Sequence, residues 1–170
     1  MIFTIEQLNK GEDTMSILSQ RIGNLAEKVK TPRLQGSVSV LNAVKLLDAH
    51  KSDILGVECE EEFAGIFTRG GYNRMVARQN LEPEETTLYE VMTLNPPYVC
   101  HDLSIKETYN AMLAYQWEHM PVLRDARLLG IVSLRDLSQN VLQSFETAEQ
   151  ENEMMLKYIR HGEAYSVSNH

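Results

Sequence analysis

The sequence has little cysteine and no long apolar run. Its two cysteines, Cys59 and Cys100, lie far apart and lack the paired close spacing that zinc and iron–sulfur sites require. We therefore expect reduced, structural thiols and no metal site. No window approaches the roughly 20 apolar residues of a membrane span, and no basic segment precedes the short apolar stretch at the start. These absences predict a soluble, cytoplasmic protein that does not bind a membrane.

Basic residues are also in short supply. The 170 residues include 16 Lys and Arg against 24 Asp and Glu, for a net charge of −8. Non-specific nucleic-acid binding needs a basic face that neutralises phosphates, so we expect no nucleic-acid partner. A small anionic ligand is compatible with this charge, because a few local arginines can hold it. The length is that of about one domain, which can bury a core without disulfides or metals.

What the sequence does contain is an internal repeat. When residue i is aligned with residue i + 65, hydroxyl, apolar and glycine positions coincide. The matched pairs are Ser39 with Ser104, Val40 with Ile105, Leu47 with Met112, Val57 with Val122, Gly65 with Gly130, Ile66 with Ile131, Thr68 with Ser133, and Val76 with Val141. A fixed period predicts two copies of one structural unit.

The residue pattern of each copy predicts the order strand, helix, strand, strand, helix. In the second copy an extended run follows Pro96, a helix opens at Ser104, and strands at 119–123 and 128–132 flank a polar turn. The first copy follows the same order but has a shorter leading stretch. We therefore expect an α/β (α+β) fold of two β-α-β-β-α repeats packed as a pseudo-symmetric pair, with extra N- and C-terminal helices.

The expected organisation has five parts. They are an N-terminal helical segment (1–24), a first repeat (25–80), a connector (81–92), a second repeat (93–147), and a C-terminal helical extension and tail (148–170).

Both ends carry apolar stripes at helical spacing. One comprises Leu18, Ile22, Leu25 and Val29, and the other runs from Val141 to Ile159 and includes Asn152. Two interpretations stay open. The stripes are core-facing helices of one subunit, or they form a helical contact of a homodimer in which Asn152 sets the register.

Three segments at the start of the second copy and within it carry a family resemblance. His119-Met120-Pro121-Val122 precedes the run GIVSLRD, residues 130–136, and Val91-Met92-Thr93 stands at the start of the repeat. This ordered set resembles the cystathionine beta-synthase (CBS) domain, here as a tandem pair, or Bateman module, over residues 25–147. The resemblance implies that the two copies pack through their sheets. It also implies a cleft that often binds adenine nucleotides or adenosyl compounds, with no cofactor required.

The resemblance further assigns candidate ligand contacts. The nucleobase would touch the first strand and the surroundings of the second strand's proline, while the phosphate and ribose would touch the serine and the aspartate. The corresponding residues here are Tyr98, Val99, Cys100, His119 and Pro121 for the base, and Ser133, Arg135 and Asp136 for phosphate and ribose. A weaker second site would use Thr68 and Arg69.

The chemistry of Ser133 and Asp136 allows two roles. A carboxylate can accept from both ribose hydroxyls, and a serine at a helix start can meet a phosphate, with Arg135 adding positive charge. The same Ser-x-x-Asp pattern caps a helix without any ligand, and both roles can coexist. His119 likewise is either a ligand contact or a satisfied residue at the core's rim.

The first copy reads GIFTRGG at residues 65–71, so Gly71 stands where the acid would fall. Losing hydrogen bonds worth about 1.5 to 3 kcal/mol each would weaken a ribose-dependent site roughly tenfold to several hundredfold. We predict a competent site at Asp136 and a weak or empty one at Thr68.

These features favour a regulatory module that binds an adenosine-containing nucleotide such as AMP, ADP, ATP or S-adenosylmethionine and modulates an unknown partner or a homodimer. The sequence presents no nucleophile–base pair or phosphate loop, so we do not expect an enzyme. The alternative is a ligand-free interaction or dimerisation scaffold, which Gly71 favours and Asp136 opposes.

Overall fold

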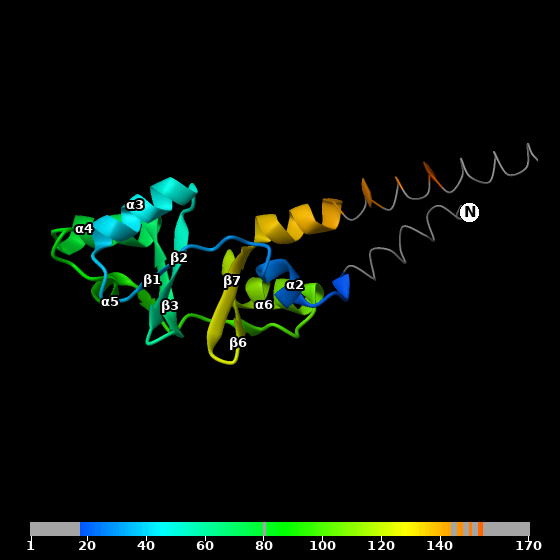
Figure 1. Ribbon diagram of the computed structural model, residues 1–170, viewed down its shortest axis with the longest axis horizontal. Helices are drawn as coiled ribbons and strands as arrows, with labels where there is room; N and C mark the ends of the chain where they lie inside the picture. Colours follow the sequence, from blue (N-terminus) through cyan, green and yellow to red (C-terminus); the bar gives the residue numbers. More distant parts are fainter. Residues whose placement is uncertain (1–17, 80, 144–145, 148–149, 151–152, 155–170) are drawn as a thin grey trace, which may run out of the picture.

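The computed structural model describes residues 18–79, 81–143, 146–147, 150 and 153–154 (Figure 1). The elements, in chain order, are α2 (Ile22–Ala26), β1 (Arg33–Gln35), α3 (Val40–His50), β2 (Ile54–Cys59), β3 (Glu62–Thr68), α4 (Arg69–Gln79), α5 (Leu88–Val91), β4 (Thr93–Leu94), β5 (Val99–Cys100), α6 (Ile105–Tyr115), β6 (His119–Arg124) and β7 (Arg127–Ser133). Residues 134–143 form the helix that follows β7. None of the described helices is long and apolar enough to span a bilayer.

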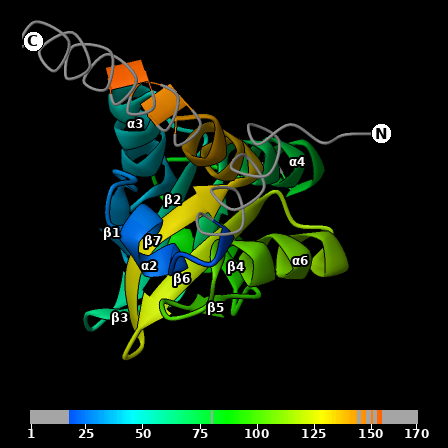
Figure 2. The same ribbon diagram turned by 90° about the vertical axis from the view of Figure 1, so that its right-hand side faces the viewer.

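Each copy of the repeat builds its own sheet. The first sheet has the order β1-β2-β3-β4 and the second has the order β5-β6-β7. The leading strand of each sheet pairs in parallel with the second strand, β1 with β2 and β5 with β6. The second and third strands form an antiparallel hairpin, β2–β3 in the first sheet and β6–β7 in the second. In Figure 1 the first copy lies on the left and the second copy beside it to the right, and Figure 2 shows the second copy in front of the first. The predicted fold class is confirmed.

The hairpin turns of the two copies have the same backbone conformation. The first hairpin turns at Glu60 and Glu61, with φ of 49° and 71°, and the second turns at Asp125 and Ala126, with φ of 49° and 62°. Two central residues with positive φ are typical of tight hairpin turns whose twist matches that of the strands. The second turn was predicted from its polar residues, and the first follows from the repeat.

Three apolar clusters form the core. One cluster lies under the helices of each copy, around Leu47 in the first and Met112 in the second. The third lies between the sheets and comprises Ile54, Ile66, Leu123, Leu128 and Ile131, with Phe63 and Trp117 packed against it. Because each sheet is covered on both faces, its central strands are apolar almost throughout.

Polar contacts join the two sheets at the rim of this third cluster. The Arg33 side chain donates to the Leu129 carbonyl at 2.8 Å, and the Phe63 N–H donates to the Ala126 carbonyl at 3.0 Å. Arg127 forms an ion pair with Glu61 at 3.1 Å. The copies therefore pack through their sheets, as the family resemblance implied.

The segment that precedes each copy packs on the other copy. The Ile22 N–H donates to the Leu103 carbonyl at 2.7 Å, and the Leu88 N–H donates to the Val38 carbonyl at 3.0 Å. In addition, β4 extends the first sheet by pairing with β3. The two leading segments thus exchange places across the molecule.

This exchange explains why both copies have a glycine at the start of their matched motifs. A Cβ at Gly65 would collide with the Thr93 carbonyl, and a Cβ at Gly130 would collide with the Ala26 carbonyl. Only glycine permits such a close approach of two backbones. The shared frame of GIFTRGG and GIVSLRD therefore serves packing.

The N-terminal stripe is core-facing, but the continuous helix predicted for it is wrong. Helix α2 spans only Ile22–Ala26, since the chain beyond it turns so that Thr31 can accept a bond from the Ile131 N–H at 2.8 Å. Leu18, Leu25 and Val29 nevertheless pack with the second copy's core. Asn152 and most of the C-terminal stripe lie outside the described residues, so the dimer contact stays a prediction.

Candidate ligand-binding site

Ser133 and Asp136 form a reciprocal cap at the start of helix 134–143. Oδ2 of Asp136 accepts from the Ser133 N–H at 2.7 Å and from the Ser133 hydroxyl at 2.6 Å. In return, Ser133 Oγ accepts from the Asp136 N–H at 3.1 Å. The capping interpretation of Ser-x-x-Asp is confirmed, because these bonds satisfy groups that a helix start leaves unpaired.

The cap changes what Asp136 can offer a ligand. With Oδ2 engaged, Oδ1 is the oxygen without a bond to any described residue. One carboxylate oxygen has two acceptor directions, so Oδ1 can still receive two hydroxyl donors. A bidentate contact that uses both oxygens would first have to break the bond from the Ser133 hydroxyl.

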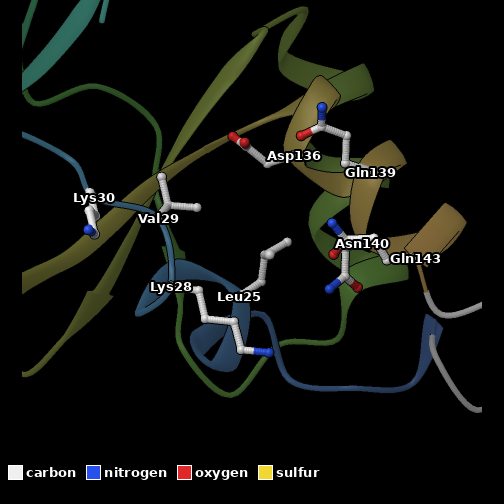
Figure 3. Close-up of a pocket in the computed structure, with 8 residues that line it drawn as sticks. All are labelled: Leu25, Lys28, Val29, Lys30, Asp136, Gln139, Asn140 and Gln143. Carbon is white, nitrogen blue, oxygen red and sulfur yellow. The ribbon is translucent and has the colours of Figure 1, made fainter. Parts of the chain in front are cut away.

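Asp136 is half-buried and lines a pocket of about 380 Å³. One wall comes from the segment before the first copy and the other from the helix that ends the second copy, as Figure 3 shows. The lining residues are Leu25, Lys28, Val29, Lys30, Asp136, Gln139, Asn140 and Gln143. The exchange of leading segments therefore creates this pocket, because it brings residues 25–30 against the second copy.

The pocket carries more positive than negative charge. Lys28 and Lys30 are exposed, and neither forms an ion pair with a described residue. Asp136 contributes the one acidic side chain among the lining residues. This local excess contrasts with the net charge of −8 of the whole chain.

The residues assigned to the nucleobase do not line this pocket. His119 lies opposite Ser133 in the β6–β7 ladder, and Pro121 is buried opposite Ile131. Tyr98 and Cys100 are exposed at the second sheet's leading strand. Of the eight residues predicted for this site, Asp136 alone is among the lining residues.

Val99 is unsuited to a side-chain contact with a ligand. It pairs with Val122 and is 6% exposed within the second copy's apolar cluster. Alternation along the strand turns Val99 toward the helices while Tyr98 and Cys100 point the other way. Its side chain therefore belongs to the core, and a contact with a ligand stays a prediction for its backbone alone.

The start of helix 134–143 offers few free donors for a phosphate. The N–H groups of Ser133 and Asp136 bond within the cap, and the Leu134 N–H donates to the Glu118 carbonyl at 3.2 Å. Arg135 is exposed on the first turn. The phosphate role predicted for Ser133 thus competes with bonds that the fold already makes.

The equivalent position in the first copy is built differently. The Gly71 N–H donates to Thr68 Oγ1 at 3.0 Å, with no carboxylate to return the bond. Arg69 forms ion pairs with Asp48 at 2.8 Å and with Asp53 at 3.2 Å. These carboxylates, Asp48 foremost, raise the pKa of Arg69. Arg69 is therefore neutralised by its own repeat and poorly placed to hold a second nucleotide.

Several pocket residues were missed from the sequence, notably Lys28 and Lys30. They flank Val29, the last residue of the N-terminal apolar stripe. Nothing in the local sequence shows that this segment crosses to the second copy. Both cysteines are free, as predicted, but exposed, which argues against a packing role.

Comparison with known proteins agrees with this architecture. A CBS domain family model matches residues 88–142. CBSCBSPB2 of Arabidopsis thaliana is 24% identical over 143 residues, which are 80% of this chain and 27% of that protein. YlbB of Bacillus subtilis is 35% identical over 98 residues, or 56% of this chain and 65% of that protein. The chain thus spans about a quarter of the length of the Arabidopsis relative.

Among solved structures, a proposed signal-transduction protein with CBS domains from Burkholderia ambifaria superimposes with a TM-score of 0.64 and 27% identity. The match covers 73% of this chain and 95% of the Burkholderia chain. The two sheets with their flanking helices have the fold of solved CBS-domain structures. Residues 88–142 thus match the CBS domain family, and most of the chain is similar to CBS-domain proteins.

Proposed function

We propose that this chain is a regulatory module that binds an adenosine-containing nucleotide in the pocket beside Asp136. The observation that carries the proposal is the opening of this half-buried carboxylate onto a cavity of about 380 Å³. That volume is within the usual range for small-molecule sites, roughly 300 to 1,000 Å³. The acid missing at Gly71 is present at this position.

The lining residues suit the parts of a nucleoside. Oδ1 of Asp136 would accept from the ribose hydroxyls while the cap holds the carboxylate in place. Leu25 and Val29 offer an apolar surface to the base, and the side-chain amides of Gln139 and Gln143 can donate or accept at its edge.

The pocket's position supports a regulatory role. A ligand there would bridge the leading segment of the first copy and the last described helix of the second. Binding would therefore stabilise this junction, by about 2.7 kcal/mol at a ligand concentration of 100 times Kd. We propose that a partner protein or a dimer contact reads this change. The Burkholderia structure, described as that of a proposed signal-transduction protein, supports regulation over catalysis.

The test is a thermal-shift panel of AMP, ADP, ATP, S-adenosylmethionine and NAD, followed by calorimetry on any ligand that shifts Tm. We expect at least one ligand to raise Tm, and Asp136→Ala to weaken its affinity roughly tenfold to a hundredfold. Because Asp136→Ala also removes a helix cap, its lower stability must be separated from its lost binding.

Glu107→Ala supplies the matched control. Glu107 caps α6 through Ser104 with the same three bonds, at 2.9, 2.7 and 3.2 Å, and does not line the pocket. The control should lower Tm and leave the affinity unchanged. A ligand bound equally well by Asp136→Ala would refute the site.

The second candidate is a ligand-free interaction scaffold. The observation in its favour is that Ser133 and Oδ2 of Asp136 are already bonded to each other. An absence of any shift across the panel would favour this function over the first.

A further inference from the structure

Two lysines give the pocket a chemical preference. Lys28 and Lys30 both line it, on the segment that faces Asp136, and neither is paired with a described carboxylate. Other described cations either form ion pairs, as Arg33 and Arg69 do, or, like Lys45 and Lys51, do not line the pocket. Unpaired cations beside a cavity in an acidic chain indicate a site for an anionic group.

The helix start on the opposite wall cannot readily take that anion. The N–H groups of Ser133, Leu134 and Asp136 already have acceptors within the fold. Asp136 itself repels a phosphate placed beside it, since both are negative. With the ribose held at Asp136, the favourable direction for a phosphate chain is toward the lysines.

We propose that Lys28 and Lys30 bind the phosphate chain of the ligand, so that the pocket selects a nucleoside polyphosphate over adenosine and over S-adenosylmethionine. The inference rests on the proposed function and names the ligand class of that site. Each phosphate adds negative charge that two ammonium groups can meet. The amino-acid part of S-adenosylmethionine carries one carboxylate together with an ammonium and a sulfonium, so it offers the lysines less negative charge than a polyphosphate does.

The experiment compares the affinities of ATP, ADP, AMP, adenosine and S-adenosylmethionine by calorimetry on three full-length proteins. They are the native chain, Lys28→Gln/Lys30→Gln, and the control Lys45→Gln/Lys51→Gln. The control changes net charge equally at two exposed positions of the first copy that do not line the pocket. The Lys51→Gln change should also disturb the fold little. Gln116, at the equivalent position of the second copy, already has the same left-handed backbone conformation.

We expect the native chain to prefer ATP and ADP over AMP, adenosine and S-adenosylmethionine. Replacing both pocket lysines should weaken ATP about fivefold for each exposed cation, or roughly 25-fold together, and leave adenosine unchanged. The control pair should alter the ATP affinity by less than about twofold, because distant exposed charges are screened.

Each remaining outcome overturns a specific claim. Equal native affinities for ATP and adenosine would overturn the inference and leave the proposed function standing. An ATP loss of the same size in the control pair would overturn it too, by assigning the effect to net charge. Failure of every compound to bind would overturn the proposed function and the inference with it.

Discussion

The two copies of the repeat agree in backbone and differ in the chemistry at one position. Both have a hairpin turn with two positive φ angles and a glycine pressed against a carbonyl of the exchanged segment. At the end of the hairpin, however, Ser133 meets Asp136 in the second copy, whereas Thr68 meets only the N–H of Gly71 in the first. Both copies therefore meet the packing requirement, and of the two equivalent positions only that of the second copy has the carboxylate that the proposed site needs.

The two copies also differ in the residue that follows the hairpin. In the first copy Arg69 is held by Asp48 and Asp53. In the second copy the equivalent residue is Leu134, which packs against the apolar cluster and leaves the polar contact to Asp136. At the position where the second copy has the carboxylate of Asp136, the first copy thus has a partly exposed cluster of ion pairs.

The largest effect that we predict concerns the two glycines that pack against backbone carbonyls in both copies. Gly65→Ala and Gly130→Ala should each lower the free energy of unfolding by about 2 kcal/mol or more, because the added methyl group overlaps a backbone carbonyl that cannot move alone. Urea denaturation monitored by circular dichroism measures the loss.

Gly70→Ala is the matched control for both variants. Its methyl group would meet only the Arg74 side chain, at 3.8 Å, and alanine favours the helix that α4 begins there. Stability should stay the same or rise by up to about 1 kcal/mol. If Gly130→Ala were as harmless as this control, the packing explanation for the shared glycine would be wrong.

The next effect concerns the part in which the copies differ. Calorimetry should give one nucleotide per native chain, and Gly71→Asp should still give one. A restored acid could bond to Thr68, but Arg69 is already paired with Asp48 and Asp53, so any second site should bind at least about tenfold more weakly. Two equal sites in Gly71→Asp would show instead that the missing acid alone separates the copies.

Most of the fold could be predicted from the sequence, because each element carries its own local signal. The strand Ile54–Cys59 and the turns at Glu60 and Asp125 follow from apolar runs broken by polar residues. The exchange of leading segments could not be predicted in this way. It depends on bonds between distant residues, such as Gly23 to the His101 carbonyl and Ile131 to Thr31, which leave no periodic trace.

The candidate site could be predicted only in part, for the same reason. Asp136 and its cap with Ser133 are local, and both are where the motif placed them. Lys28 and Lys30 approach Asp136 only through the exchanged segment. The inward direction of the Val99 side chain follows from alternation along the strand, because its neighbours Tyr98 and Cys100 are exposed.

A smaller effect would sharpen the contrast at Arg69. Arg69→Leu gives the first copy the residue of the second, and it should lower Tm slightly by leaving Asp48 and Asp53 without their shared cation. Because Arg69 is partly exposed, the loss should shrink as salt is raised from low to near-molar concentration. Nucleotide affinity at Asp136 should not change, and a changed affinity would mean that the copies are coupled at this point.

The smallest effect compares the helices that follow the leading strands. In the second copy, Glu107 accepts from the backbone and the hydroxyl of Ser104, and these bonds lower its pKa. In the first copy, Ser39 makes no side-chain cap bond, and Asn42 stands where the glutamate would be. A carboxylate with a lowered pKa stabilises the folded state above its unfolded pKa, and this stabilisation is lost as pH falls through the folded pKa. Glu107→Gln should therefore lower Tm at neutral pH and match the native chain in acid.

The converse change in the first copy, Asn42→Glu, should raise stability by about 0.5 kcal/mol at neutral pH. A Tm difference for Glu107→Gln that persisted unchanged below the folded pKa would assign the effect to side-chain packing, and the two helices would then differ for a reason other than the charge of the cap.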